Sequence, residues 1–249
     1  MSLELDFCDH ILTPRKISLP SRYYYFDDQE PYIKLLSVGE GLFPNDRVCT
    51  TINITNSALI LATESAAKIY PSDRYFAKTK THFRLRCSNL EYIGDELILF
   101  QNSKLIQLLT IDFDEKSTFF YSEILSGGRS AQTHKWSCLA VKNRFVYDGD
   151  IEYLEQYAFA GEETKQYISD HPSQQNLFAK IYIRARDNEA LREELNDKQI
   201  YSSAYTQNRA MIIVVILGDK ISHIKAEIER VWGIYRLSLG KRQFDLGKR

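Results

Sequence analysis

Short apolar or alternating segments recur through the first two-thirds of the chain, separated by polar or glycine-containing breaks. Alternation of apolar and polar side chains indicates a half-buried strand, and a short continuous apolar run indicates a strand buried on both faces. We expect no helix of usual length before about residue 160. The predicted strands are 32–37, 47–54, 58–63, 81–87, 90–93, 104–113, 118–125, 136–141, 144–147 and 151–159.

The pattern changes in the final third of the chain. Leu191 and Leu195 are four residues apart among Glu and Arg, which predicts a modest amphipathic helix over 187–197. Two further strands, 200–206 and 210–217, alternate or run apolar on either side of a polar break.

A last helix is predicted between Asp219, a candidate N-cap, and Gly240, which would stop it. Its apolar stripe consists of Ile221, Ile224, Ile228, Val231, Trp232 and Tyr235. The tail 240–249 is basic and contains two glycines, so we expect a mobile end.

This order of elements predicts a mainly β fold. Closely spaced short strands indicate stacked sheets or a single closed sheet, and we expect a β-helix-like or sandwich-like stack with a few short helices and the C-terminal helix. The chain shows no fixed-period repeat, which argues against a regular solenoid. At 249 residues we expect a single domain over 1–249.

Composition narrows the class of partner. The formal net charge of −1 argues against broad capture of nucleic acid, which needs a strongly basic surface. No apolar run approaches the ~20 residues that cross a bilayer, so we expect no membrane association. The first residues lack the basic and apolar regions of a secretory signal, which predicts a cytoplasmic protein.

Cysteine and histidine give little local chemistry. The four cysteines are scattered singly and are expected to be buried thiols. The five histidines show no spacing that builds a metal site from local sequence, and His134, after the loop at 127–129, is the best single metal candidate against a structural role. The chain also lacks a nucleophile elbow, a dinucleotide fingerprint and a Walker motif, which argues against nucleotide binding.

Two carboxylates interrupt apolar strands. Glu123 shares a face with Tyr121 and Leu125, so it lies either on a solvated face or in an interior cavity. Glu155 is embedded among tyrosines in the same way. A buried carboxylate must pair, accept hydrogen bonds or coordinate a cation, because an isolated charge is too costly to leave dry.

Several segments, in order along the chain, resemble the urease accessory protein D family. The strongest match is 62–70, with Thr63, Ala66, Lys68 and Tyr70 at the positions of the family's Thr-Thr-Gln-Ala-Ala-Thr-Lys-Val-Tyr segment. The other similar segments are the glycine loop 39–46, the Leu-Glu-Tyr stretch 90–100, the acidic residue and Gly-Gly-Arg turn 123–129, the Asp-Gly element leading to Glu155, and the closing helix 229–236 with its Trp and Arg. The family's Pro-Arg-Ile-Trp ending is replaced here by Asp245-Leu246-Gly247-Lys248-Arg249.

The resemblance implies a mostly β protein without catalytic activity that takes part in urease maturation. Its implied partners are apo-urease and accessory protein F, through which the GTPase accessory protein G is recruited. The resemblance further implies no tightly bound cofactor but nickel(II) in transit through a hydrated interior, lined by the acidic positions Asp46, Glu123 and Glu155. Oxygen ligands suit such a passage because they hold a borderline cation weakly enough to release it.

Two other hypotheses use the same residues. A β-rich hydrolase could draw its acid/base pair from Glu123 and Glu155. A β-sandwich module that binds a peptide or sugar fits the composition but leaves the ordered string of matches unexplained.

Overall fold

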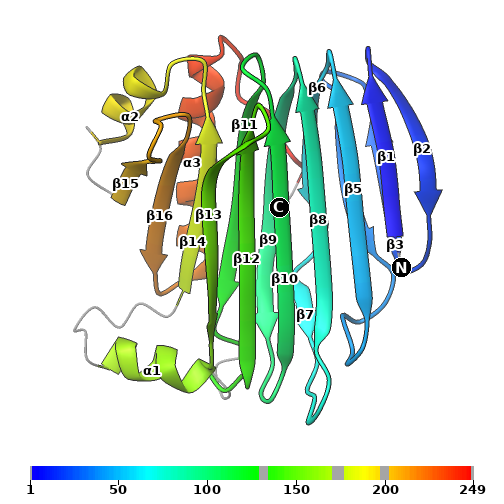
Figure 1. The fold of residues 1–249 in the computed structure, drawn as a ribbon, viewed down its shortest axis with the longest axis vertical. Coiled ribbons are helices and arrows are strands. Elements are labelled where there is room, and N and C mark those ends of the chain that lie inside the picture. The colour runs from blue at the N-terminus through cyan, green and yellow to red at the C-terminus, as the bar shows by residue number, and fades with distance from the viewer. Residues whose placement is uncertain (1, 129–133, 170–176, 197–201, 248–249) are drawn as a thin grey trace.

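Two facing β-sheets make up most of the molecule in the computed structural model, which describes residues 2–128, 134–169, 177–196 and 202–247 (Figure 1). Sheet A has the order β13 (Asp150–Phe159), β12 (Cys138–Tyr147), β10 (Lys104–Phe113), β8 (Ala77–Arg86), β5 (Arg47–Thr55), β1 (Ser2–Cys8) and β2 (Ile11–Ile17). Sheet B has the order β15 (Ser202–Tyr205), β16 (Ile212–Gly218), β14 (Leu177–Arg184), β11 (Thr118–Ser126), β9 (Asn89–Leu99), β6 (Ala58–Thr63), β4 (Tyr32–Ser37) and β3 (Ser21–Phe26), with β7 (Ala67–Ile69) beside β9.

From β5 to β12 the chain winds as a coil, because successive long strands alternate between the two sheets. Within each sheet the strands of this region run parallel, whereas the outer strands β2, β3, β13, β14, β15 and β16 pair antiparallel. The mainly β fold of stacked, β-helix-like sheets is therefore confirmed. Absence of a sequence repeat was a poor guide, because each coil needs only inward apolar positions in register and not a repeated sequence.

The core between the sheets is built from such in-register rows. Leu5, Ile52, Phe83, Ile111 and Phe145 lie side by side on five neighbouring strands of sheet A, and all are buried. A second cluster around Leu42, Leu99 and Trp136 fills the other end of the same space. Burying large apolar side chains gives roughly 1.5–3 kcal/mol each, so these rows hold the two sheets together.

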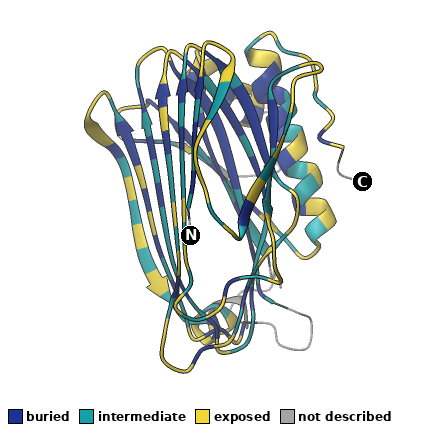
Figure 2. Cartoon of the chain, turned by 90° about the vertical axis from the view of Figure 1, so that its right-hand side faces the viewer, coloured by how far each residue is buried: buried dark blue, intermediate teal, exposed yellow. Residues whose placement is uncertain are grey.

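Helices cover the outer side of sheet B (Figure 2). The long α3 (Ile221–Ser238) packs on β11, β14 and β16, and α2 (Asn188–Asn196) packs on α3 and β15. A shorter helix, α1 (Gly161–Ser169), follows β13. The last helix is confirmed, but Asp219 is not its N-cap: Lys220 takes that position in an extended conformation without a side-chain capping bond. None of the described helices combines the length and apolar composition that a bilayer-spanning helix requires.

Five of the described strands, namely β1, β2, β3, β7 and β14, are absent from the sequence prediction, and the two segments predicted at 136–141 and 144–147 form the single strand β12. The expectation of a mobile tail was wrong up to residue 247: Phe244 packs on Tyr32, and Leu246 is buried. The expectation of buried thiols was also wrong, because Cys8, Cys49 and Cys87 are exposed and Cys138 is partly exposed. All four cysteines lie at outward positions of sheet A strands or just beyond the end of one.

Candidate functional site

A band of polar side chains crosses the inner face of sheet A between the two apolar clusters. Thr50, Thr81, Asn143 and Glu155 occupy one row of neighbouring strands, interrupted only by Leu109 of β10. Alternation along each strand points this row toward sheet B, as it does the apolar rows on either side. Polar groups in this position need partners, and Asn143 finds one in Glu123 of β11.

The sequence left Glu123 either on a solvated face or in an interior cavity, and the structure places it in the interior. Its strand β11 belongs to sheet B, and its side chain lines a cavity of about 160 Å³ between the sheets. The Gln107 amide nitrogen donates to Glu123 Oε2 at 3.1 Å, and the Asn143 amide nitrogen donates to Glu123 Oε1 at 3.2 Å. Both donors come from sheet A, so the carboxylate bridges the two sheets.

Glu155 reaches the same cluster from the edge strand β13. Its Oε1 accepts a charge-assisted hydrogen bond from the Lys180 ammonium, and its Oε2 accepts one from the Tyr182 hydroxyl at 2.7 Å. Lys180 and Tyr182 both belong to β14, where Lys180 stands directly opposite Glu123 in the register. The two carboxylates found in the sequence are thus brought together, and the cation between them comes from a strand that the sequence analysis missed.

Tyr182 joins the two carboxylates. Its hydroxyl oxygen lies 3.3 Å from Glu123 Oε1 as well as 2.7 Å from Glu155 Oε2. Because a phenol carries one proton, it donates to one carboxylate at a time, and the shorter distance favours Glu155. Asn143 donates to the Tyr182 oxygen at 3.0 Å, which completes a connected network.

Burial controls the protonation of this network. Loss of solvent raises the pKa of Glu123 from its ordinary 4.5 to about 7; the nearby Lys180 ammonium opposes the rise, and Glu155 adds to it. Burial, followed by the two carboxylates, raises the pKa of Tyr182 well above its usual value, so its hydroxyl stays protonated. Near neutral pH the cluster therefore exchanges a proton at Glu123 at little cost.

A second cavity of about 230 Å³ adjoins the first. The two share Leu42, Thr63, Thr79 and Tyr92 among their lining residues, and the second cavity extends toward β3 and β4. A third, much smaller space of about 30 Å³ adjoins Glu123 on its other side, beside Tyr157 and Phe178.

The glycine loop and the segment 62–70, which carried much of the resemblance, meet at this second cavity. Leu42 and Lys68 are joined by a backbone hydrogen bond of 2.8 Å, and Tyr70 returns one to Leu42 at 2.9 Å. Gly41 has a positive φ of 148°, and a Cβ there would lie 2.4 Å from the Lys68 carbonyl oxygen. Gly41 is therefore required for this close approach.

Asp46 lies apart from the two glutamates. Its carboxylate accepts a hydrogen bond of 2.9 Å from the Phe43 backbone amide, which closes the turn before β5. It is not among the described residues that line the cavities holding Glu123. The structure thus brings together two of the three acidic positions singled out in the sequence.

His134 is packed into the protein core, which is typical of a structural role. Its ring is buried, lies 5.3 Å from the Trp136 ring between centroids, and packs against Gly127. Within the described ranges no cluster of three or more His, Cys, Asp or Glu side chains is arranged to hold a metal ion.

Sequence reasoning missed four members of the cluster, namely Gln107, Asn143, Lys180 and Tyr182. The sequence does contain one signal for the most important of them, Lys180. Lys180 interrupts the apolar segment Leu177–Arg184 in the same way that Glu123 interrupts its own strand. Opposite charges at interrupting positions of two apolar strands indicate a cross-strand pair.

Comparisons with known proteins agree on one family. The model of the family described as UreD urease accessory protein matches residues 14–246. A urease accessory protein UreD from Aliarcobacter butzleri (strain RM4018) is 42% identical over 249 residues, which is the whole of both chains. Proteins of the same name from Bacillus sp. (strain TB-90) and Staphylococcus aureus (strain bovine RF122 / ET3-1) are 32% identical over 110 residues (43% of this chain, 41% of the relative) and 25% identical over 174 residues (61% and 62%), respectively.

Proposed function

The chain belongs to the UreD urease accessory protein family, and from this premise we propose that it is a non-catalytic scaffold that binds apo-urease and accessory protein F. Through accessory protein F it bridges to the GTPase accessory protein G, in the cytoplasm. Its own contribution to nickel insertion is the polar interior between the two sheets, along which nickel(II) moves in transit.

The observation that carries this proposal is the convergence of Glu123 and Glu155 inside the molecule. The two residues are far apart in sequence and lie on different sheets, yet both contact the Tyr182 hydroxyl. Cavities continue from this cluster past Thr63 and Tyr92 toward the glycine loop. A purely structural pair would not need adjoining cavities next to it.

The chemistry of the cluster suits transit better than storage. Carboxylate, amide and phenol oxygens are hard ligands that bind nickel more weakly than a set of imidazoles and thiolates would. Lys180 already neutralises Glu155, and a proton resides on Glu123 for part of the time near pH 7. An entering divalent cation must displace the ammonium or the proton, so its net affinity stays low and release stays fast.

The same two carboxylates are the candidate acid/base pair of the hydrolase hypothesis. The matched relatives are named accessory proteins, which supports the scaffold. The two hypotheses differ in what they require of Lys180: an acid/base pair needs Glu155 open to a substrate, whereas here its Oε1 is bonded to the ammonium.

Co-expression tests the scaffold. The chain, cognate apo-urease and accessory protein F are produced together. The complex is captured through an affinity tag on the urease and is then analysed by size-exclusion chromatography. We expect all three in one peak, with accessory protein G joining when it is added. Absence of this chain from the urease peak under every salt condition would contradict the proposal.

A second experiment tests the passage. The Glu123→Gln/Glu155→Gln variant should still form the complex but should load less nickel into urease, measured by elemental analysis of the purified urease. Glu152→Gln is the matched control, because Glu152 is a buried glutamate of the same strand β13 whose partners are Thr206 and Asn208. Equal nickel content with the double variant and with the control would exclude the passage while leaving the scaffold intact.

A further inference from the structure

Sheet B is interrupted beside Glu123. Two residues of β9, Gly94 and Asp95, stand opposite this single residue of β11, because the register between the two strands shifts between Ser122 and Ile124. Such an arrangement is a β-bulge, which leaves an extra residue out of the ladder and disrupts the pairing locally. The interruption therefore falls next to the carboxylate at the centre of the interior cluster.

The opposite side of β9 is also unpaired at this point. Among the described strands, β6 pairs with β9 only as far as Ile93, and β7 pairs with it again from Leu97 onward. Between them the Asp95 amide donates to the Thr63 hydroxyl at 2.7 Å, which takes the place of a ladder hydrogen bond. Sheet B thus has a break in its backbone pairing on both sides of residues 94–95.

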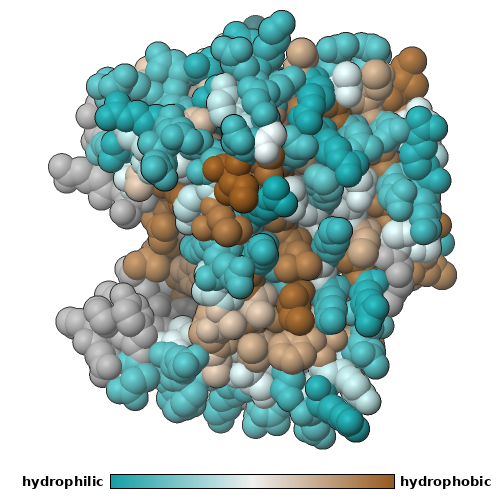
Figure 3. Space-filling view, in the orientation of Figure 1, coloured by the Kyte–Doolittle hydropathy of each residue, from teal (hydrophilic) through white to brown (hydrophobic). Residues whose placement is uncertain are grey.

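Sheet A is continuous in front of the same interior. The strands β5, β8, β10 and β12 pair along their length without a register shift. Figure 3, which views the molecule from this side, shows hydrophilic and hydrophobic side chains intermixed over these strands. Of the two sheets, sheet B is therefore the one whose pairing offers a way through.

Cavities lie on both sides of the break. The inner one is the cavity of about 160 Å³ that Glu123 lines, and the outer one, of about 190 Å³, lies between sheet B and α3. Gly94, Asp95 and Ile124 line both cavities. Leu246 of the C-terminal tail also lines the outer one. The interrupted part of sheet B thus forms a wall between the two cavities.

Carboxylates lie on both sides of this wall. Burial raises the pKa of the Tyr92 hydroxyl, and the charges of Asp95 and Glu123 raise it further, so both carboxylates act on one side chain of the inner cavity. The Asp95 side chain is only 8% exposed. Glu229 of α3 lines the outer cavity and is exposed. Negative charge therefore extends from the interior cluster through the break to the outer surface.

The ammonium of Lys225 stands on the outer side of the break. Its Nζ lies 2.9 Å from Asp95 Oδ1 and 2.9 Å from Glu96 Oε2, so one cation lies between two carboxylates. Burial acts to lower the pKa of Lys225, but its bonds to Glu96 and Asp95 outweigh burial and raise it, and the amine stays charged. The side chain is 41% exposed, so its long stem can turn toward solvent.

We propose that this break in sheet B is a portal for nickel(II), and that Lys225 closes the portal by occupying the cation position between Asp95 and Glu96. The inference rests on the proposed nickel passage and gives that passage one mouth and a gate. An arriving nickel ion displaces the ammonium, since its double charge interacts more strongly with two carboxylates than a single charge does. The lysine returns once the ion has moved on to Glu123.

An interior thiol tests the portal without urease. Thr81→Cys places it on β8, where residue 81 lines the inner cavity but neither the second cavity nor the outer one. The rate of reaction with the cationic reagent aminoethyl methanethiosulfonate is measured by peptide mass spectrometry, with the exposed Cys49 as the internal reference. Lys225→Met should raise the rate at residue 81 at least about tenfold and leave the rate at Cys49 unchanged, because it removes an obstacle and a repelling charge.

Further variants separate opening from other effects. Lys225→Arg keeps the cation and should react like the wild type, and Lys225→Gln replaces Lys225→Met if circular dichroism shows that the latter does not fold. Arg230→Met removes a cation from the same helix, where Arg230 pairs with Glu227 and lines none of these cavities. Ser103→Cys, at a fully buried position outside the cavities, reports general loosening. No rise at residue 81 with Lys225 removed, or an equal rise with Arg230→Met or at residue 103, overturns the inference.

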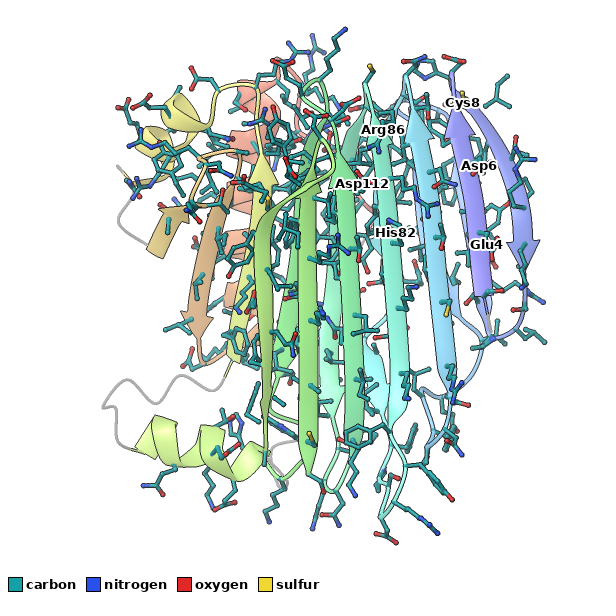
Figure 4. The ribbon with its side chains drawn as sticks, in the orientation of Figure 1. Glu4, Asp6, Cys8, His82, Arg86 and Asp112 are labelled. Atoms are coloured by element: carbon teal, nitrogen blue, oxygen red, sulfur yellow. The ribbon has the colours of Figure 1, made fainter. Side chains whose placement is uncertain are left out.

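Nickel loading tests the portal in the assembly. In the co-expressed complex, Asp95→Asn should lower the nickel content of the urease to the level found with Glu123→Gln/Glu155→Gln, because both variants remove carboxylates of one route. Asp112→Asn is the matched control, since Asp112 pairs with Arg86 on the open side of sheet A, where Figure 4 shows the two. Normal loading with Asp95→Asn and reduced loading with the double variant overturn the portal and leave the passage with another mouth. Normal loading with both contradicts the passage itself.

Discussion

The guanidinium of Arg236 on α3 donates a hydrogen bond of 2.6 Å to the carboxylate of Glu91 on β9, and both side chains are almost fully buried. The Trp232 indole donates to the same carboxylate at 2.7 Å, and the Lys241 ammonium does so at 2.6 Å. Glu30 adds a second carboxylate to Arg236. This network fixes the long helix and the following tail to sheet B.

Removing the arginine should be severe. Arg236→Met leaves the Glu91 carboxylate dry with only Lys241 and the indole to balance it, and breaking a buried pair in this way costs about 3–5 kcal/mol. We expect that loss in urea denaturation at pH 7. In a double-mutant cycle with Glu91→Gln, the double variant should be less destabilised than the sum of the two singles by more than about 1 kcal/mol.

Arg230→Met is the control for that cycle. Arg230 pairs with Glu227 one turn away on a partly exposed side of α3, and such pairs contribute about 0.2–1 kcal/mol. A cost for Arg236→Met no larger than that of Arg230→Met would show that the buried network does not hold the helix.

The same network shows what the sequence could predict. Glu91 lies in one of the recognised segments, and Trp232 with Arg236 lies in another, yet the sequence alone gives no contact between positions more than 140 apart. The last helix was predictable because its apolar stripe has helical spacing. Its contact with Glu91 was not, because a buried charge is placed by the tertiary structure that balances it.

The residues of the candidate site were likewise predictable only in part. Glu123 and Glu155 were identifiable because a carboxylate inside an apolar strand is expensive and demands an explanation. Lys180 and Tyr182 were missed with their strand β14, and the boundary of that strand follows a segment outside the described residues. Asp46 was selected by resemblance alone. In the structure its carboxylate accepts a hydrogen bond from the Phe43 backbone amide in the turn before β5, apart from Glu123 and Glu155.

The raised pKa of Glu123 predicts a pH-dependent stability. Its pKa is about 7 in the folded chain against an ordinary 4.5, so between these values the folded state holds a proton that the unfolded state has released. This contribution to stability is complete below pH 4.5 and is lost as the pH rises through 7. The loss amounts to roughly 2 to 3 kcal/mol between pH 5 and pH 8.

Glu123→Gln isolates that contribution, because glutamine resembles the protonated acid. The variant should be more stable than the wild type at pH 8, and its free energy of unfolding should change less between pH 5 and pH 8 when both are measured in urea. Asn143 helps the substitution, since its side-chain oxygen has no hydrogen-bond partner within the described structure and can accept from the new amide. Parallel pH profiles for the two proteins would contradict the prediction.

Lys180 should control how well the interior accepts a cation. Lys180→Met leaves Glu155 without its ammonium and Glu123 without the opposing charge, so we expect a loss of about 2–4 kcal/mol in stability at pH 8. If the passage exists, nickel(II) should replace the missing charge. Millimolar nickel chloride should then raise the thermal midpoint of the variant more than that of the wild type, because a ligand that binds the folded state stabilises it.

Lys34→Met provides the comparison for Lys180→Met. Lys34 is equally shielded, but it pairs with Glu64, a single carboxylate near the surface. Nickel should not rescue this variant. Rescue of both variants to the same extent would mean that nickel binds the chain without regard to the interior cluster.

The packing of His134 on Gly127 gives a test of the structural role of that histidine. A Cβ on residue 127 would lie 2.6 Å from the His134 ring, and the ring is buried against Trp136 with little room to move. Gly127→Ala should therefore destabilise the chain by about 1–3 kcal/mol through overpacking. The Gly127→Ala/His134→Ala variant should recover part of that loss relative to the sum of the single variants in urea denaturation, because the smaller residue removes the clash. A metal ligand predicts a further effect: His134→Ala would also reduce the nickel loaded into co-expressed urease, whereas a purely structural His134 predicts unchanged loading by the folded variant.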